Sequence, residues 1–185
     1  KINLLEHLLK TDADFSKVLI FCNNKKNADY LYTKIDELFP DEFDVIHSNK
    51  SQNYRLNAMR NFEAQKVRGL ITTDIMARGL DISDITHVIN FEIPEVPEQY
   101  IHRIGRTGRA DKNGISISFV TKKEETLLLD IELLMDKALI MKDFPAEVKV
   151  NPVKIASEKE TVVMKNAHTV KLEEGGGAFH DKKDK

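Results

Sequence analysis

Five short segments of the chain are rich in apolar residues and are bounded by polar residues or turn signals. They cover residues 18–22, 43–46, 67–71, 87–90 and 115–120. The first, Val18–Cys22, is a continuous apolar run between Lys17 and Asn23, a pattern typical of a strand buried on both faces. The last segment alternates between apolar and polar residues, as a half-buried strand does. We therefore expect five strands.

Between these segments, apolar residues recur at helical spacing. One stripe comprises Leu4, Leu5, Leu8 and Leu9, a second comprises Ala28, Leu31, Ile35 and Leu38, and a third comprises Leu56, Met59 and Phe62. Asn23 or Asn24 is placed to cap the second helix, which Pro40 ends, and Ser51 is placed to cap the third. Pro97 suits the first turn of a fourth helix. Residues 124–138 predict a strongly apolar last helix.

Strands that alternate with helices predict an α/β fold with a mostly parallel sheet covered on both faces. Ligands of such sheets bind at the carboxyl ends of the strands. Polar segments follow the first three expected strands at Asn23, at residues 48–49 and at residues 72–81. An arginine-rich segment follows the fourth strand after one short helix. These segments are therefore expected to meet at one edge of the sheet.

The length of 185 residues suits one domain followed by a tail. We place the domain at residues 1–142, because prolines, scattered charges and a Gly-Gly-Gly run characterise residues 143–185. This tail is expected to be extended and flexible, with one short extended stretch at residues 161–164. No apolar run is long enough to span a membrane, so no membrane partner is expected.

Composition narrows the classes of site. The net charge is −2, so contact with nucleic acid would have to come from a local groove rather than from a basic domain. The single cysteine, Cys22, lies in an apolar run, so we expect a buried, inert thiol and no disulfide, which fits a cytoplasmic location. The six histidines are scattered without the spacing of metal ligands, and no metal site is predicted.

The strongest chemical signal is the sequence Tyr-Ile-His-Arg-Ile-Gly-Arg-Thr-Gly-Arg at residues 100–109. It places Arg103, Arg106 and Arg109 three residues apart and adds two glycines, which are unfavourable inside a helix. Guanidinium groups on a glycine-rich turn suit a phosphate, because arginine offers planar bidentate donors and glycine lets the backbone approach closely. The alternative is a positively charged surface loop that has no binding or catalytic function.

This sequence resembles the last conserved motif of DEAD-box ATP-dependent RNA helicases. Three further matches occur in the order of that family: Leu-Ile-Phe-Cys-Asn at residues 19–23, Gln52 with Arg55 three residues later, and Thr-Thr-Asp-Ile-Met-Ala-Arg-Gly-Leu-Asp at residues 72–81. The resemblance covers about residues 1–140. It implies a RecA-like three-layer αβα sandwich around the mostly parallel central sheet.

The resemblance also implies that ATP is held mainly by another domain and that this one completes the site. Arg106 and Arg109 would reach the γ-phosphate and act as catalytic arginine fingers. Asp81 would accept hydrogen bonds from the ribose hydroxyls, and Gly79 would let the backbone approach the nucleotide. Surface ion pairs or RNA phosphate contacts are the alternatives for the arginines, and an ordinary turn aspartate is the alternative for Asp81.

A second implication is binding to the RNA backbone, largely independent of base sequence. Thr73 would offer its hydroxyl and backbone N–H to a phosphate. Gln52 and Arg55 share one helix face and would support the RNA-binding loop. Asn49 is a further RNA contact, although the family usually has Gly-Asp where this chain has Ser-Asn. A helix cap for Thr73 and a solvated helix face for Gln52 and Arg55 are the alternatives.

Three residues are expected to couple the two halves of such an enzyme. His102 and Arg103 would contact the partner domain or the neighbouring motif in the closed state, and Arg78 would bridge motifs. A hydrogen-bonded, half-buried histidine is an equally simple interpretation of His102. Asp74 is expected to cap or to pair locally.

The chain lacks a Gly-x-x-x-x-Gly-Lys-[Ser/Thr] loop and an Asp-Glu-Ala-Asp motif, which hold ATP, Mg²⁺ and the attacking water in the family. The sequence therefore predicts the second motor domain of an ATP-dependent RNA helicase, inactive as an ATPase alone. Its partner would be the N-terminal RecA-like domain of the same parent chain, which would hold Mg²⁺. Two alternatives stay open: a non-catalytic RNA- or protein-binding module, and another helicase branch. A Glu-Glu-Gly-Gly-Gly-Ala-Phe-His stretch in the tail resembles bacterial RhlE-like members.

Overall fold

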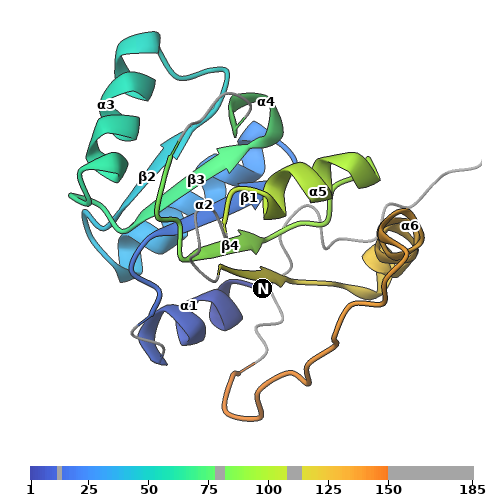
Figure 1. Ribbon diagram of the computed structural model, residues 1–185. Helices are drawn as coiled ribbons and strands as arrows, with labels where there is room; N and C mark the ends of the chain where they lie inside the picture. The colour runs from blue at the N-terminus through green and yellow to red at the C-terminus, as the bar shows by residue number, and fades with distance from the viewer. Residues whose placement is uncertain (12–13, 78–81, 108–113, 150–185) are drawn as a thin grey trace, which may run out of the picture.

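The computed structural model of the chain describes residues 1–11, 14–77, 82–107 and 114–149. Within these ranges, one sheet contains the strands β1 (Val18–Cys22), β2 (Phe43–Ile46), β3 (Gly69–Thr73), β4 (His87–Asn90) and β5 (Ile115–Ser118). All neighbouring strands are parallel, in the order β2-β3-β1-β4-β5 (Figure 1). The mostly parallel α/β fold predicted from the alternation of strands and helices is confirmed.

Helices cover both faces of this sheet (Figure 1). On one face lie α1 (Ile2–Thr11) and α2 (Lys25–Leu38), and on the other lie α3 (Gln52–Glu63), α4 (Asp74–Ala77) and α5 (Pro97–Ile104). A 3-10 turn (Lys122–Glu124) leads into α6 (Glu125–Met135), which packs beside α5. The arrangement is a three-layer αβα sandwich.

The central strand β1 divides its side chains between the two cores. Val18, Ile20 and Cys22 pack toward α1 and α2, whereas Leu19 and Phe21 pack toward α3. All five side chains are buried, as the continuous apolar run predicts. Burial also raises the pKa of the Cys22 thiol far above its ordinary value, because the thiolate would lose its hydration.

The expected helix caps form, and one strand is shifted. The side chain of Asn24 accepts a hydrogen bond from the Asn27 backbone at the start of α2, and Ser51 does so at the start of α3. The strand predicted at residues 67–71 lies two residues later in the structure, because Thr72 and Thr73 pair with the end of β1. Threonine is β-branched and suits a central strand, although it interrupts the apolar pattern.

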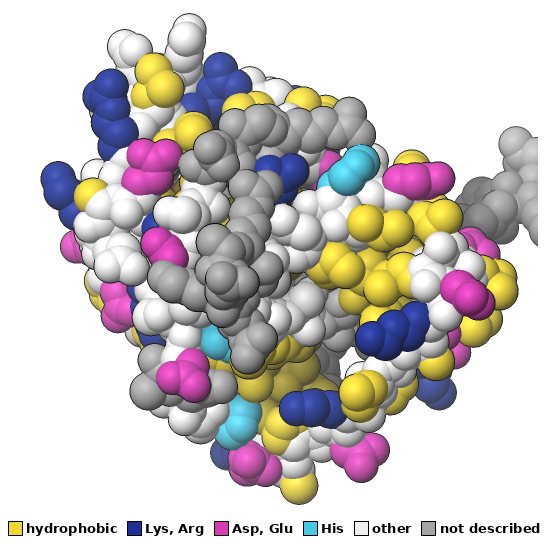
Figure 2. All heavy atoms as spheres, viewed as in Figure 1, with side chains coloured by type: hydrophobic (Ala, Val, Ile, Leu, Met, Phe, Trp, Pro, Cys, Tyr) yellow, Lys and Arg dark blue, Asp and Glu magenta, His cyan; other side chains and the backbone are white. Residues whose placement is uncertain are grey.

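The last strand and the last helix are shorter than predicted. The strand predicted at residues 115–120 ends at Ser118, and the helix predicted at residues 124–138 ends at Met135. Asp136 adopts a left-handed conformation (φ 49°) there, and its backbone N–H bonds back to Leu133. The helix is apolar on its outer side too, with Leu133 79% exposed. Apolar side chains accordingly gather at the right of Figure 2, where α6 lies.

The chain beyond α6 returns to the first helix. Asn3 Nδ2 donates to the Lys149 carbonyl at 2.7 Å, and His7 Nε2 lies 3.7 Å from the Glu147 carboxylate. Val148 is buried. The boundary at residues 142 and 143 stays a prediction, and residues 150–185, with the stretch at 161–164, lie outside the described residues. Within those that are described, no helix is long and apolar enough to cross a membrane.

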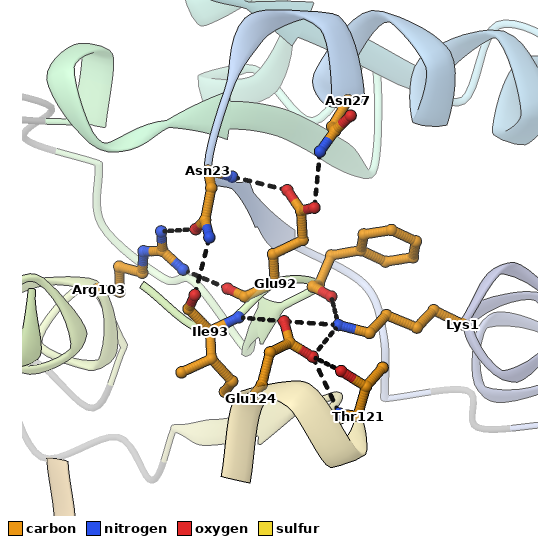
Figure 3. A network of polar contacts seen from close by, with 9 residues as sticks. Lys1, Asn23, Asn27, Glu92, Ile93, Arg103, Thr121 and Glu124 are labelled. Atoms are coloured by element: carbon orange, nitrogen blue, oxygen red, sulfur yellow. Dashed lines mark hydrogen bonds and ion pairs between the residues drawn. The ribbon is translucent and has the colours of Figure 1, made fainter. Parts of the chain in front are cut away.

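A carboxylate between α1 and α6 ties the two ends of the domain together (Figure 3). Glu124 lies 2.7 Å from the Lys1 ammonium, accepts from the Ile93 backbone at 3.1 Å and accepts from the Thr121 hydroxyl at 2.6 Å. Burial acts to raise the pKa of Glu124, but the Lys1 ammonium and the Thr121 hydrogen bonds outweigh it and hold the pKa below its ordinary value.

The close contact between β2 and β3 generates a first prediction. A Cβ added at Gly69 would clash with ring carbons of Phe43, which pairs with Gly69 in the sheet. Gly69→Ala should therefore lower the free energy of unfolding by about 1–3 kcal/mol, as overpacked cores do. Chemical denaturation measures this. Phe43→Leu in the same protein should recover part of the loss, and strictly additive effects of the two changes would contradict the contact.

The Glu124 ion pair generates a pH-dependent prediction. Because its folded pKa is lowered, Glu124 stabilises the fold above its ordinary pKa, and this stabilisation is lost as the pH falls through the folded pKa. Glu124→Gln should cost about 2 kcal/mol at pH 7, and the difference from wild type should shrink below the ordinary value of 4.5. Urea denaturation between pH 3 and 7 would use Glu63→Gln, an exposed carboxylate, as control. A difference independent of pH would contradict the ion pair.

Candidate functional site

The segments that carry the sequence motifs meet at the carboxyl edge of the sheet. Asn23 follows β1, Asp74 follows β3, and Glu92 follows β4 by two residues. The helix α5 then brings Arg103 into their midst, and Figure 3 shows its guanidinium pointing toward Asn23 and the Glu92 carbonyl. The predicted meeting of these segments at one edge is therefore observed.

Arg103 is the centre of this edge. Its Nε and Nη2 atoms donate to the two carboxylate oxygens of Asp74 at 2.6 and 2.7 Å. Nη2 also donates to Asn23 Oδ1 at 2.9 Å, and Nη1 donates to the Glu92 carbonyl at 2.7 Å and to Asn90 Oδ1 at 3.4 Å. These five contacts match the five N–H donors of a guanidinium. The side chain is 1% exposed, so its charge is fully enclosed.

This location corrects one expectation. Arg103 belongs to α5, which ends at Ile104, and it contacts Asp74 in the neighbouring motif, one of the two kinds of contact expected of it. Asp74 does not pair locally, since its partner lies 29 residues further along the chain. A buried charge is tolerated only with a bidentate partner and satisfied donors, and removal of one partner typically costs about 3–5 kcal/mol. Arg103 therefore links the motif after β3 to the segment after β4, whereas its neighbour His102 is exposed.

A second carboxylate joins the ends of β1 and β4. Glu92 is 1% exposed and accepts from the Asn23 backbone N–H at 2.9 Å and from Asn27 Nδ2 at 2.7 Å (Figure 3). Asn23 Nδ2 in turn donates to the Ile93 carbonyl at 2.8 Å. A negative charge at the first turn of α2 also agrees with the dipole of that helix. The start of α2 is thus fixed to the segment that leads into α5.

Of the residues predicted to contact the nucleotide, the structure describes Arg106. It lies in the turn after α5, is partly buried, and its Nε donates to the His102 carbonyl at 3.3 Å. Thr107 fixes the same turn to the segment before β4, because its hydroxyl donates to the Ile85 carbonyl at 2.7 Å. Gly79, Asp81 and Arg109, together with the coupling candidate Arg78, lie outside the described residues.

The residues predicted to contact RNA lie at the neighbouring strand ends. Thr73 ends β3 and is 8% exposed, while Asn49 is exposed in the turn after β2. Gln52 and Arg55 lie in the first turn of α3, the former exposed and the latter partly buried. Arg55 Nη1 contacts Met76 Sδ at 3.2 Å and so joins α3 to α4. The structure brings these four residues to the carboxyl edge of the sheet.

Sequence reasoning did not assign functions to Asn23, Asn90 and Glu92, which hold this edge together. Each is a polar residue at or just beyond the end of a buried strand, and Asn90 and Glu92 are almost completely enclosed. A buried polar side chain requires partners, so polar residues that directly follow an apolar run are the signal that could have found them. Among the described residues, no three metal-ligating side chains converge.

Comparisons with known proteins agree with this geometry. The family described as "Helicase conserved C-terminal domain" matches residues 1–111. DEAD-box ATP-dependent RNA helicase 35A of Oryza sativa subsp. japonica is 44% identical over 138 residues, which cover 74% of this chain and 21% of the relative. The probable ATP-dependent RNA helicase ddx41 of Dictyostelium discoideum is 38% identical over 181 residues, 97% of this chain and 25% of the relative.

Solved structures show the same fold. The E. coli DEAD-box protein SrmB, bound to regulator of ribonuclease activity A, superposes with a TM-score of 0.68 at 31% identity, covering 74% of this chain and 79% of that one. S. cerevisiae Dbp5 bound to RNA and ADP BeF3 gives 0.66 at 31% identity, covering 75% of this chain and 36% of that one.

The curated relatives also set limits on the comparison. The chain spans about a quarter or less of their length. Both are eukaryotic, so they give no support to the RhlE-like subtype suggested by the tail. The RecA-like fold, the matched residues and the identity to these proteins nevertheless agree. The chain belongs to the helicase conserved C-terminal domain family, in the form found in DEAD-box RNA helicases.

Proposed function

We propose that the chain is the second motor domain of an ATP-dependent RNA helicase and completes an active site shared with an N-terminal RecA-like domain of the same parent chain. The observation that supports this most is the rigid carboxyl edge around Arg103. Arg103 fixes the segments after β1, β3 and β4 to α5, and Arg106 follows directly in the next turn. The residues proposed to bind the nucleotide and those proposed to bind RNA thus belong to one folded domain.

On the nucleotide side, Arg106 and Arg109 offer guanidinium groups to the γ-phosphate. Asp81 accepts from the ribose hydroxyls and Gly79 admits the nucleotide close to the backbone. Arg106 suits a phosphate because a guanidinium offers planar bidentate donors, and its Nε bond to the His102 carbonyl restrains the side chain beside α5. ATP supplies the phosphoryl group when it is bound, and Mg²⁺ is held by the N-terminal domain. The arginines stabilise the negative charge that spreads over the phosphoryl oxygens during transfer.

On the RNA side, Thr73 and Asn49 contact phosphates, and Gln52 and Arg55 support the turn before α3. The Arg55 contact with Met76 joins this group to α4, which begins with the Asp74 partner of Arg103. RNA and nucleotide contacts are therefore mechanically connected, so closure of the two domains couples hydrolysis to local strand separation. Dbp5 bound to RNA and ADP BeF3 shows a relative that holds both ligands.

His102, Arg78 and Arg103 are the coupling residues in this proposal. His102 is exposed beside Arg103 and faces outward from α5, which suits contact with the partner domain. Arg103 acts from within, by holding α5 against α4. Because the contacts are to the backbone, binding should depend weakly on base sequence and strongly on salt. A cytoplasmic location remains a prediction.

The proposal predicts that the chain is inactive alone and active when joined to its native upstream domain. RNA-stimulated ATP hydrolysis should be absent in the chain and present in the joined protein. The two proteins would be assayed side by side at one salt concentration with single-stranded RNA. RNA binding without turnover in the joined protein would instead favour the alternative, a non-catalytic RNA- or protein-binding module.

A second prediction concerns the arginine fingers. In the joined protein, Arg106→Ala and Arg109→Ala should each lower kcat by about a thousandfold or more, because a charge at the transferred phosphoryl group is lost. RNA affinity should stay within about twofold of wild type, since neither residue binds the RNA backbone in this proposal. Arg60→Ala, an exposed arginine on α3, serves as the matched control. Normal turnover in both variants would refute their assignment.

A further inference from the structure

The turn at residues 47–50 joins β2 to α3 and is held by a buried histidine. His47 follows the last residue of β2 and is 1% exposed. Its Nε2 lies 2.9 Å from Asp29 Oδ1 on α2. Its Nδ1 accepts a hydrogen bond from the Asn49 backbone N–H at 3.3 Å. Both ring nitrogens are therefore in use, one toward a helix and one toward the turn.

The two bonds together define one form of the ring. Nδ1 accepts from a backbone N–H, so the proton of the neutral imidazole is assigned to Nε2, which donates to Asp29. A residue that only filled space here could be aliphatic, because burial of an imidazole requires that its polar atoms be satisfied. His47 instead spans from α2 to the backbone of Asn49, and its ring orientation sets where that residue lies.

Lysines reinforce the same turn from two sides. Lys50 Nζ lies 2.9 Å from Asp29 Oδ1, and the Lys50 backbone N–H donates to the His47 carbonyl at 3.0 Å. Lys25 Nζ donates to Asn49 Oδ1 at 2.8 Å. Burial acts to raise the pKa of Asp29, but the hydrogen bonds from His47 and Lys50 outweigh it and hold the pKa below its ordinary value. Asp29 is thus a carboxylate at neutral pH.

These bonds fix which atoms of the turn remain for a ligand. The backbone N–H groups of Asn49 and Lys50 are both used inside the turn. The Asn49 side chain is exposed with its Oδ1 bound to Lys25, and its Nδ2 has no partner among the described residues. The two N–H donors of this exposed amide therefore lie beside the Lys25 ammonium group. This arrangement suits an anionic acceptor such as a backbone phosphate.

We propose that His47 is a positioning residue for RNA binding, which presents the side-chain amide of Asn49 to a phosphate of the RNA backbone. This inference rests on the proposed function and deepens it. It assigns the RNA contact expected of Asn49 to the side-chain amide of that residue. It also gives Asp29, on the opposite face of the sheet from α3, an indirect part in RNA binding.

Two nearly isosteric variants separate positioning from packing. In His47→Asn the amide oxygen can take the place of Nδ1 and accept from the Asn49 N–H, whereas in His47→Gln the amide lies near the place of Nε2 and the bond to the turn is lost. In the joined protein, RNA affinity in the presence of a non-hydrolysable ATP analogue should be near wild type for His47→Asn. It should be about fivefold weaker for His47→Gln, the equivalent of one hydrogen bond. Fluorescence anisotropy measures both.

The controls distinguish this inference from a general loss of structure. Nucleotide affinity without RNA should be unchanged in both variants, and Asn49→Ala should reproduce the loss without touching the interior. His7→Gln removes a histidine of α1 that lies near the Glu147 carboxylate, far along the chain from the turn, and should have no effect. Amide exchange at Asn49, followed by NMR, should be faster in His47→Gln than in His47→Asn.

The outcomes are separable. If wild type binds RNA but His47→Gln and His47→Asn bind it equally well, or Asn49→Ala binds normally, the inference is overturned and the proposed function stands. A parallel loss of RNA and nucleotide affinity in the His47 variants would show a structural role only, which also overturns it. Absence of RNA binding by the wild-type joined protein would refute the proposed function and the inference together.

Discussion

The enclosed ion pair between Arg103 and Asp74 is the interaction on which the functional edge depends. Strand ends in a parallel sheet are separate loops, and nothing in the backbone ladder fixes one loop relative to the next. A guanidinium with five satisfied donors does so, since it binds groups that follow β1, β3 and β4 at once. The guanidinium carbon also lies 5.1 Å from the centroid of the Phe21 ring, so a cation–π contact holds the charge against strand β1.

Much of the fold could be predicted from the sequence, because burial leaves a direct trace there. The run Val18–Cys22 and the cap Ser51 were found from residue type and spacing, and Asn24 was one of two candidates for the cap of α2. The sequence did not predict the hydrogen bonds and ion pairs between polar residues that lie far apart in the chain. The spacing of Arg103 suggested a turn, and only the packed fold shows that it reaches Asp74. Such pairs leave no periodic signal, since each partner is an ordinary polar residue in its own segment.

The edge uses two different physical solutions for two tasks. Around Arg103 a full charge is buried and paired with Asp74. Breaking this ion pair is costly, so the contact holds the two motifs in a fixed relative position. Around His47 a neutral ring is buried, and the charges of Asp29, Lys25 and Lys50 stay near solvent. The contacts of Lys25 and Lys50 in the second arrangement are weaker, because their charged groups are accessible to water.

The single cysteine gives the molecule a built-in reporter. Cys22 ends the central strand, pairs with Thr73 in the sheet and is followed directly by Asn23, one of the partners of Arg103. Its sulfur is fully enclosed, and only the thiolate reacts with alkylating reagents. Labelling at this one position therefore requires the middle of the sheet to open. The labelling rate therefore measures how often the interior next to the Arg103 contacts opens.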